Sequence, residues 1–413
     1  MPLLTSLLIL IVVARLFGQI FQRLDQSAIV GEILAGVLLG PSLLNLIQVN
    51  AALAGIAELA VFLVVLSAGL EMSFKDVIAS LHGRGAVVAF IGFALPLAGG
   101  ILVGVAFELD VMRTVFLGLC VSITALPVAV RILQSFKLLD SVMARYAVAT
   151  AIFNDVAALL ALGVILTLPA QHSLQAIGLA ILGTGSKLLA LAGFILGCNW
   201  LLERLIARGL HIAGIPEKLV ALFGGEALFG VVVLFVLVFG SISQALGFHF
   251  VIGAFFGALL LDRKFFLAPR YHEIDRTLRS ITEGFLAPVF FAYLGLEFNP
   301  AAISSAGFVA VVLAVSIATK ILAGWLGGLL IQLSSLQALG IGIILNGRGI
   351  MELVIANIAY ERGFIGQGLF STLVLMGVVT TLITPLMLRK WIMPKLEGTH
   401  PTAAPAPPGT STP

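Results

Sequence analysis

Apolar segments, each long enough to cross a lipid bilayer, follow one another along almost the whole chain. A transmembrane helix needs roughly 20 consecutive apolar residues. Cutting the sequence at its polar breaks gives thirteen segments of about this length: 3–21, 28–46, 51–70, 85–107, 113–132, 143–168, 174–202, 219–241, 248–261, 284–298, 301–333, 337–360 and 366–391. We therefore predict an all-α membrane protein with about thirteen transmembrane helices.

The composition supports this reading and excludes some other classes. Hydrophobic residues make up 60% of the 413 residues and charged residues 10%, against roughly 25% charged residues in an ordinary soluble domain. A soluble protein of this size could not bury so much apolar surface. Because no basic patch is interleaved with aromatic residues, we expect no nucleic-acid partner.

The distribution of Lys and Arg predicts the orientation in the membrane. Seventeen of these residues lie in the odd-numbered loops and the C-terminal tail, whereas the even-numbered loops hold only Arg113 and Arg362. Cytoplasmic loops carry the excess of positive charge. We therefore expect the N-terminus outside and the C-terminus in the cytoplasm, with the lipid bilayer as the surrounding solvent.

Short sequence matches indicate an internal repeat. Gly69-Leu-Glu71 corresponds to Gly295-Leu-Glu297, Ala35-Gly-Val-Leu-Leu39 to Phe256-Gly-Ala-Leu-Leu260, and Leu117-Gly-Leu119 to Leu339-Gly-Ile341. Each pair is seven predicted spans apart, and seven is odd, so the two copies cross the membrane in opposite directions. Inverted repeats of this kind are typical of secondary transporters.

The repeat divides the chain into four predicted parts. Residues 1–168 form transmembrane repeat 1, 169–216 a linker helix and cytoplasmic loop, 217–398 transmembrane repeat 2, and 399–413 a disordered tail rich in Pro, Ala and Thr. Each repeat has a predicted broken helix, near 122–128 where Pro127 interrupts the pattern, and near 346–349 where two glycines do. We expect these broken helices to cross near the middle of the membrane and to border the substrate site.

Asp155 is the first candidate for function. It stands in the middle of the sixth span, after Asn154, and 147–168 holds no other charge. An ionised carboxylate at that depth is costly and usually functional. Hard oxygen ligands suit Na⁺ or K⁺, and we predict such ligands from the Asp155 carboxylate, the Asn154 and Thr124 side chains, Ser122, and the carbonyls around Thr124 and Ala125. Arg15, Glu32 and Glu226, in the first, second and eighth spans, are each expected to pair with a residue of another helix and not to bind the ion.

The order of motifs resembles a known family. Thr124-Ala-Leu-Pro-Val128, Asn154-Asp155, Ala318-Thr-Lys-Ile-Leu322 and Asn346-Gly-Arg-Gly-Ile-Met-Glu-Leu353 are similar to motifs of the monovalent cation/proton antiporter superfamily, in the branch of the Kef-type systems and plant cation/proton exchangers. The resemblance implies an ion-carrying core domain, a dimerisation domain, a homodimer and elevator-like alternating access. It also implies a bacterial inner-membrane protein acting in pH homeostasis, with no cofactor beyond the transported ions.

The resemblance also implies roles for single residues. Asp155 matches the acid that binds the ion and the proton, and Thr124 matches a polar residue of the first broken helix. Lys320 matches a basic residue beside the acid, where we expect a countercharge to Asp155 in the empty state. Arg348 and Glu352 match a charge-compensating or gating pair. The chain departs from electrogenic members at Asn154, where they carry a second acid, so we expect one-for-one, electroneutral exchange.

Several functions stay open at this stage. The favoured one is exchange of Na⁺ or K⁺ for H⁺, in which the ion and the proton compete for Asp155, and no enzymatic reaction is expected. One alternative is a sodium-coupled organic anion symporter of similar fold, which would favour several polar ligands over one dominant acid. Another is a cation channel or membrane sensor, which needs no alternating access; the inverted repeat argues against it.

Overall fold

The computed structural model describes residues 2–24, 26–80, 82–166, 174–208, 220–261, 266, 268–303 and 305–397. Over these residues the chain is helical and contains no strand. The predicted tail at 399–413 lies outside the described residues, as do parts of the predicted linker at 169–173 and 209–216.

The N-terminal part of the chain, up to the long helix α9, contains α1 (Leu3–Arg23), α2 (Ala28–Leu39), α3 (Ala51–Glu71), α4 (Phe74–Ser80), α5 (Gly83–Ala106), α6 (Val111–Ser122), α7 (Leu126–Ser135), α8 (Val142–Leu166) and α9 (Leu174–Ala207). The C-terminal part contains α11 (Gly225–Ala245), α12 (Phe250–Leu260), α13 (Ala268–Ile281), α14 (Ala287–Glu297), α15 (Ala306–Leu330), α16 (Ser335–Leu345), α17 (Ile350–Glu361), α18 (Gln367–Met387) and α19 (Met393–Glu397). Short π-helical stretches lie at Thr282–Leu286 and Leu388–Ile392, and a 3₁₀ turn lies at Pro300–Ala302.

Among the described residues, eight helices are long and apolar enough to cross a membrane, or nine when the bent pair of α16 and α17 counts as one span. The chain is therefore an integral membrane protein, as predicted. Each of the thirteen predicted segments overlaps a helix or a helix pair, but thirteen complete spans stay a prediction. Some boundaries were wrong: α2 ends at Leu39 and not at 46, because the chain turns there, and α15 begins at Ala306 and not at 301.

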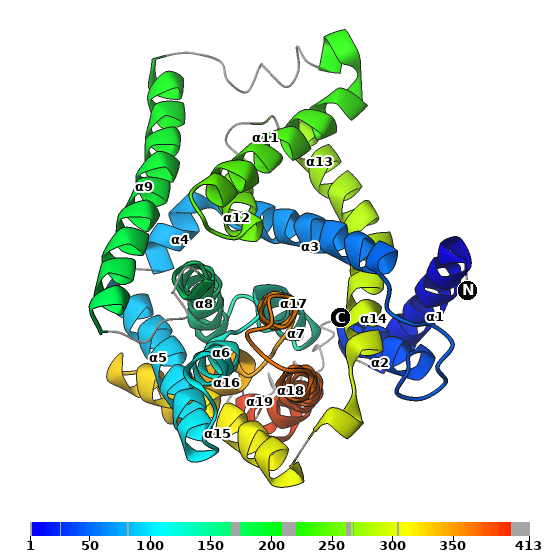
Figure 1. Cartoon of the computed structure of the whole chain (residues 1–413). Helices are drawn as coiled ribbons and strands as arrows, with labels where there is room; N and C mark the ends of the chain where they lie inside the picture. Colours follow the sequence, from blue (N-terminus) through cyan, green and yellow to red (C-terminus); the bar gives the residue numbers. More distant parts are fainter. Residues whose placement is uncertain are drawn as a thin grey trace, which may run out of the picture.

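One group of helices forms a row, which we call the panel. Its neighbours in order are α1, α2, α14, α3, α12 and α11, and Figure 1 shows α3 running between the α1–α2–α14 side and the α11–α12 side. If α1 corresponds to α11, α2 to α12 and α3 to α14, this order reads the same from either end. Two related repeats would produce such an order, so the packing supports the predicted repeat, while the opposite orientation of its halves stays a prediction.

The other group, which we call the core bundle, consists of α5 to α8 and α15 to α18. Here α6 packs on α5, α5 on α15, and α15 on α16, again an order that is symmetric when α5 corresponds to α15 and α6 to α16. The broken helices α6–α7 and α16–α17 lie inside this bundle beside α8 and α18 (Figure 1).

Glycines allow the central helices of the panel to touch. A Cβ atom at Gly36 of α2 would overlap the carbonyl of Ala292 in α14, and a Cβ at Gly295 of α14 would overlap the carbonyl of Ile33 in α2. Small residues let helix backbones approach closely in membranes, where apolar burial alone does not drive association. These two positions therefore fix α2 against α14.

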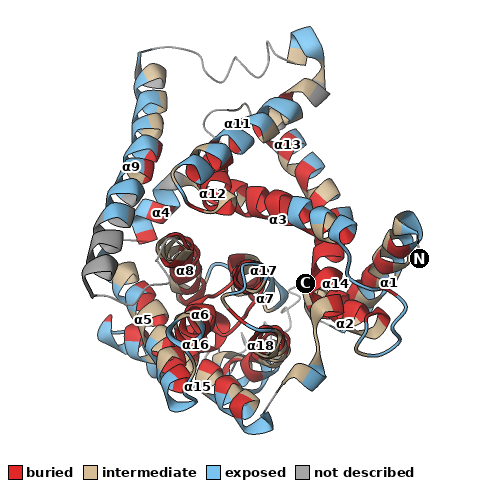
Figure 2. Ribbon diagram, viewed as in Figure 1, coloured by how far each residue is buried: buried red, intermediate tan, exposed pale blue. Residues whose placement is uncertain are grey.

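Burial differs between the inner and outer helices. Figure 2 shows α6, α16 and α17 largely buried, whereas α1 and α9 are exposed along one side. The exposed side of α1 carries Leu4, Leu8, Val12, Leu16 and Ile20. Such a stripe fits contact with lipid, and the polar residues of the broken helices are enclosed by protein.

Candidate ion-binding site

The two broken helices meet where their helical hydrogen bonding stops. The first break separates α6 from α7 at 123–125, inside the predicted 122–128, and the second separates α16 from α17 at the predicted 346–349. The Ala125 amide donates a hydrogen bond to the Gly347 carbonyl at 3.3 Å. The Thr124 hydroxyl donates to the Leu345 carbonyl at 2.8 Å. The two breaks are thus joined directly to each other.

The sequence explains both breaks. Pro127 lies in the first turn of α7, where a missing N–H costs nothing, whereas inside a continuous helix it would remove a hydrogen bond. On the other side, a Cβ atom at Gly349 would lie 2.8 Å from Val128 Cγ2 and 2.9 Å from Ala125 Cβ. Only glycine leaves enough room there for the two breaks to approach.

Helix α8 brings the predicted acid to this place. Asn154 and Asp155 are 0% and 1% exposed. The Asn154 amide nitrogen donates to the Ser122 carbonyl and to the Thr124 hydroxyl, at 3.2 Å each. Asp155 Oδ1 and Asn154 Oδ1 are buried and have no hydrogen-bond partner in the described part of the chain. Two oxygen atoms next to the breaks are therefore left free to act as ligands.

The Lys320 ammonium lies at the same point, where it binds oxygen atoms of the first break. Lys320 of α15 is fully buried and donates to the Gly92 carbonyl at 3.1 Å, to the Thr124 hydroxyl at 2.8 Å and to the Ser122 carbonyl. Among the described residues no ion pair joins it to Asp155. The charges of Lys320 and Asp155 still act on each other, so the countercharge role of Lys320 stays a prediction, and the carbonyls of the first break hold the ammonium in place.

Arg348 sits in the second break and also binds the end of α6. Its guanidinium donates to the carbonyl of Cys120, to those of Val121 at 2.7 Å and Ile123 at 3.1 Å, and to the Ser316 hydroxyl at 2.9 Å. The last carbonyls of a helix lack intrahelical donors and carry partial negative charge. Arg348 and Lys320 together neutralise this helix end.

Glu352 lies 3.6 Å from Arg348, and both side chains are fully buried. Both of its carboxylate oxygens lack a hydrogen-bond partner among the described residues. The guanidinium of Arg348 instead donates its hydrogen bonds to the end of α6 and to Ser316. The expected pair of Arg348 and Glu352 is present, and at 3.6 Å it is longer than the hydrogen bonds that Arg348 donates.

The remaining predicted ligands divide into two cases. Ser122 takes part through its carbonyl, since its hydroxyl donates to Leu119 within α6 at 2.7 Å. The Ala125 carbonyl accepts one hydrogen bond, from the Ala129 amide at 3.0 Å inside α7, and keeps a second lone pair, so its role as a ligand stays a prediction.

Three threonines at or next to the two breaks were not predicted from the sequence. Thr381 of α18 accepts from the Arg348 amide at 3.3 Å and donates to the Arg348 carbonyl at 3.0 Å. Thr384 accepts from the Asn346 amide nitrogen at 3.2 Å. Thr150 is fully buried and its hydroxyl has no described partner. Thr150 precedes Asn154 by one helical turn, and that spacing was the signal that could have identified it.

A cavity of about 530 Å³ separates the panel from the core bundle and approaches the crossing. Its walls include Leu126 and Pro127 at the start of α7 and Ile350 at the start of α17. Asp155 does not line it. Chemically, the arrangement offers a buried carboxylate that can hold either a proton or a cation, with neutral oxygens beside it.

Comparison with known proteins shows the family to which the chain belongs. A model of the family described as "Sodium/hydrogen exchanger, transmembrane" matches residues 7–393. The chain is 29% identical over 406 residues to Cation/H(+) antiporter 18 of Arabidopsis thaliana, covering 92% of this chain and 47% of the relative. It is 26% identical over 386 residues to a Na(+)/H(+) antiporter of Enterococcus hirae, covering 93% and 97%. The chain thus spans about half the length of the plant relatives it matches.

A further relative and a solved structure extend the likeness. The Na(+)/H(+)-K(+) antiporter GerN of Bacillus cereus is 24% identical over 376 residues, covering 91% of this chain and 92% of that protein. The structure of the sodium proton antiporter MjNhaP1 from Methanocaldococcus jannaschii superposes with a TM-score of 0.67 at 18% identity, covering 95% and 97%. At that identity the structural match concerns the fold. The relatives named here are transporters.

Proposed function

Because the chain belongs to the sodium/hydrogen exchanger transmembrane family, as its motifs indicated, we propose that it exchanges Na⁺ or K⁺ for H⁺ across a membrane. The observation that carries this proposal is Asp155. It is a buried carboxylate beside two helix breaks, with one oxygen free of any described partner. A carboxylate in that position is stabilised either by a proton or by a bound cation, and each excludes the other.

The proposed ligands are the Asp155 carboxylate, the free Asn154 Oδ1, the Thr124 hydroxyl and the Ser122 carbonyl. All are hard oxygen donors of the kind that alkali cations accept. Two of them, Thr124 and Ser122, are bound to the Lys320 ammonium. We propose that this ammonium occupies cation ligands in the empty state and withdraws when Na⁺ or K⁺ arrives.

Alternating access is proposed to arise from movement of the core bundle against the panel. The cavity between them supports this, since its lining includes residues of α2 on the panel side and the start of α7 at the crossing. In secondary transporters of repeat architecture, one group of helices moves around a fixed site. From the positive-inside rule we propose that the cavity faces the cytoplasm, with the N-terminus outside and the C-terminus inside. We also propose a homodimer in a bacterial inner membrane, as the family resemblance implies.

Proton flux in reconstituted vesicles tests the proposal. Addition of Na⁺ or K⁺, but not of choline, is expected to move protons out of acid-loaded vesicles. Asp155→Asn should abolish this proton movement. A thermal unfolding transition close to that of the wild type should show that the variant is still folded. Asp110→Asn is the matched control, because Asp110 is an exposed cap of α6 that Asn can replace. Near-normal exchange by Asp155→Asn would refute the mechanism.

A further inference from the structure

The cavity between the panel and the core bundle has walls of opposite charge. The panel wall carries two arginines and four carboxylates, listed by residue as Arg15, Arg279, Glu32, Glu71, Asp275 and Glu283, for a formal charge of −2. The wall formed by α7 and α17 carries one charged lining side chain among the described residues, Arg131. Closing the cavity would bring opposite charges together.

Most of the panel charges already have partners. Arg279 pairs with Glu71 at 3.0 Å, Asp275 at 3.1 Å and Glu283 at 3.3 Å. Arg15 donates to the backbone carbonyl of Glu283 at 3.0 Å. These contacts lie within the panel and the adjoining α13, so movement of the core bundle leaves them in place.

Glu32 and Arg131 are different. Glu32 is 5% exposed, and in the described part of the chain neither Glu32 nor Arg131 makes an ion pair or a side-chain hydrogen bond. The charges of Arg15 and Arg131 both act on Glu32, although neither side chain forms an ion pair with it. Glu32 lines the cavity, and closing the cavity would remove water from its carboxylate, which is costly unless an ion pair compensates it.

The carboxylate position is built by the neighbouring helix. A Cβ atom at Gly18 of α1 would lie 3.1 Å from Glu32 Oε1 and 3.2 Å from Glu32 Cγ. Glycine at this position leaves the space that the carboxylate occupies. Glu32 is thus held from behind by α1 while its side chain lines the cavity.

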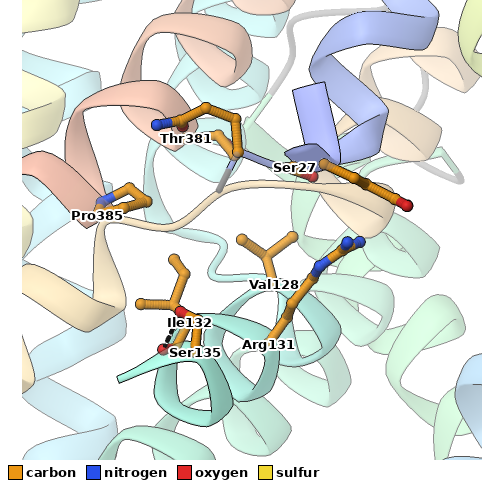
Figure 3. A pocket seen from close by; sticks show the side chains of 9 residues that line it. Ser27, Val128, Arg131, Ile132, Ser135, Thr381 and Pro385 are labelled. Atoms are coloured by element: carbon orange, nitrogen blue, oxygen red, sulfur yellow. Dashed lines mark hydrogen bonds between the residues drawn. The ribbon is translucent and has the colours of Figure 1, made fainter. Parts of the chain in front are cut away.

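Arg131 comes from the opposite side. Figure 3 shows Arg131 with Val128, Ile132 and Ser135 of α7 on one side of a smaller adjoining cavity, and Ser27, one turn before Glu32 on the panel side, across from them. Because α7 follows the first break directly, any movement of the crossing moves Arg131. The distance between Arg131 and Glu32 therefore depends on the position of the core bundle.

We propose that Glu32 and Arg131 form an ion pair when this cavity closes, and that the pair holds the closed form. The inference rests on the proposed function, since it assumes that the core bundle moves against the panel. The pair acts as an interdomain latch. It binds no substrate and lies apart from Asp155.

A double-mutant cycle on exchange by the full chain in vesicles tests the latch. Glu32→Gln and Arg131→Gln should each slow exchange about tenfold, since a coupling of this kind changes an equilibrium by roughly 5- to 150-fold. The double variant should be no slower than either single one. Glu283→Gln is the matched control, because it removes a carboxylate of the same wall that is paired with Arg279. In the double variant with Arg131→Gln, the fold-changes in exchange rate of the two single variants should multiply.

The outcomes separate the two proposals. If the wild type exchanges cations but the effects of Glu32→Gln and Arg131→Gln multiply, or either is absent, the latch is wrong and the proposed function stands. If the wild type moves no protons in response to cations, the proposed function fails, and the latch is then judged by cross-linking.

Cross-linking measures the approach of the two residues without relying on transport. In a Cys198→Ser background, Glu32→Cys combined with Arg131→Cys should lose maleimide labelling on mild oxidation and regain it on reduction, because the two thiols meet when the cavity closes. Either cysteine alone should stay labelled. Full labelling of the oxidised double variant would overturn the latch even if neutral variants at these positions proved unstable.

Discussion

Replacement of Lys320 by glutamine should have opposite effects on the empty and the cation-loaded protein. The ammonium donates to the Gly92 and Ser122 carbonyls and to the Thr124 hydroxyl. Hydrogen bonds from charged groups contribute roughly 1.5–3 kcal/mol each, but desolvating the ion costs several kcal/mol. Three such bonds outweigh that cost, so the unfolding free energy of the empty protein should fall by about 1–4 kcal/mol.

The effect of Lys320→Gln on cation binding is expected to be favourable, opposite to its effect on stability. Ser122 and Thr124 are proposed cation ligands, and the ammonium competes for them. If displacing it costs about 1.4 kcal/mol, its removal should lower the half-saturating cation concentration about tenfold. A ligand that binds only the folded state stabilises it in proportion to the logarithm of its concentration over Kd. Saturating Na⁺ or K⁺ should therefore recover most of the stability that Lys320→Gln loses in choline.

Two measurements check this pair of effects. Thermal unfolding of purified protein in choline and in Na⁺ or K⁺ gives the stability difference, and proton flux in vesicles gives the half-saturating concentration. Lys187→Gln is the matched control, since Lys187 lies on α9 with an exposed side chain and should change neither. An unchanged or raised half-saturating concentration for Lys320→Gln would refute the competition argument.

Four other predictions concern the site and the topology. Arg348→Met should cost about 3–5 kcal/mol because it leaves Glu352 as an uncompensated buried charge, and adding Glu352→Met should recover part of that loss in thermal unfolding. Gly349→Ala should destabilise the crossing, where a Cβ atom would meet α7 at 2.8 Å; normal stability and exchange would contradict this. In the pH range in which Asp155 is mostly protonated, a cation must displace the proton, so lowering the pH by one unit should raise the half-saturating cation concentration about tenfold. Cysteines placed at the N-terminus and beside His400 should react from opposite sides of oriented vesicles.

The positions of the helices and of both breaks could be predicted because they depend on local sequence. Apolar length fixes where a chain can cross a bilayer, and Pro127 and the glycines around Arg348 interrupt helices by their own backbone chemistry. Asp155 stood out for a similar reason, since a carboxylate in the middle of an apolar segment is visible without any knowledge of packing.

The partners of the charged residues could not be predicted in the same way. Spacing suggested Glu352 as the partner of Arg348, yet the guanidinium binds carbonyls of α6 that are more than 200 positions away in the sequence. Those carbonyls are free only because α6 stops at Ser122. A backbone group that becomes an acceptor through tertiary structure carries no side-chain signal, so the carbonyls that Lys320 and Arg348 bind could not be read from the sequence.

These assignments change the reasoning about obligatory exchange. Lys320 and Arg348 both bind the carbonyl end of α6, whereas the end of α16 is satisfied by the neutral Thr124 hydroxyl and Ala125 amide. The positive charges of the site are thus committed to one helix end, and Glu352 stands next to Arg348. Asp155 is left without a direct ion pair among the described residues.

A bare Asp155 carboxylate is therefore the expensive form of the site. Burying one uncompensated ion costs several kcal/mol, and each 1.4 kcal/mol lowers a population tenfold. If moving the core bundle requires Asp155 to be enclosed, a carrier with neither proton nor cation should cross between its two forms at least about a hundredfold more slowly than a loaded one. Coupling then follows from desolvation, without a separate gate. Uncoupled proton leak through wild-type vesicles lacking Na⁺ and K⁺, at a rate close to that of exchange, would show that some other group neutralises Asp155.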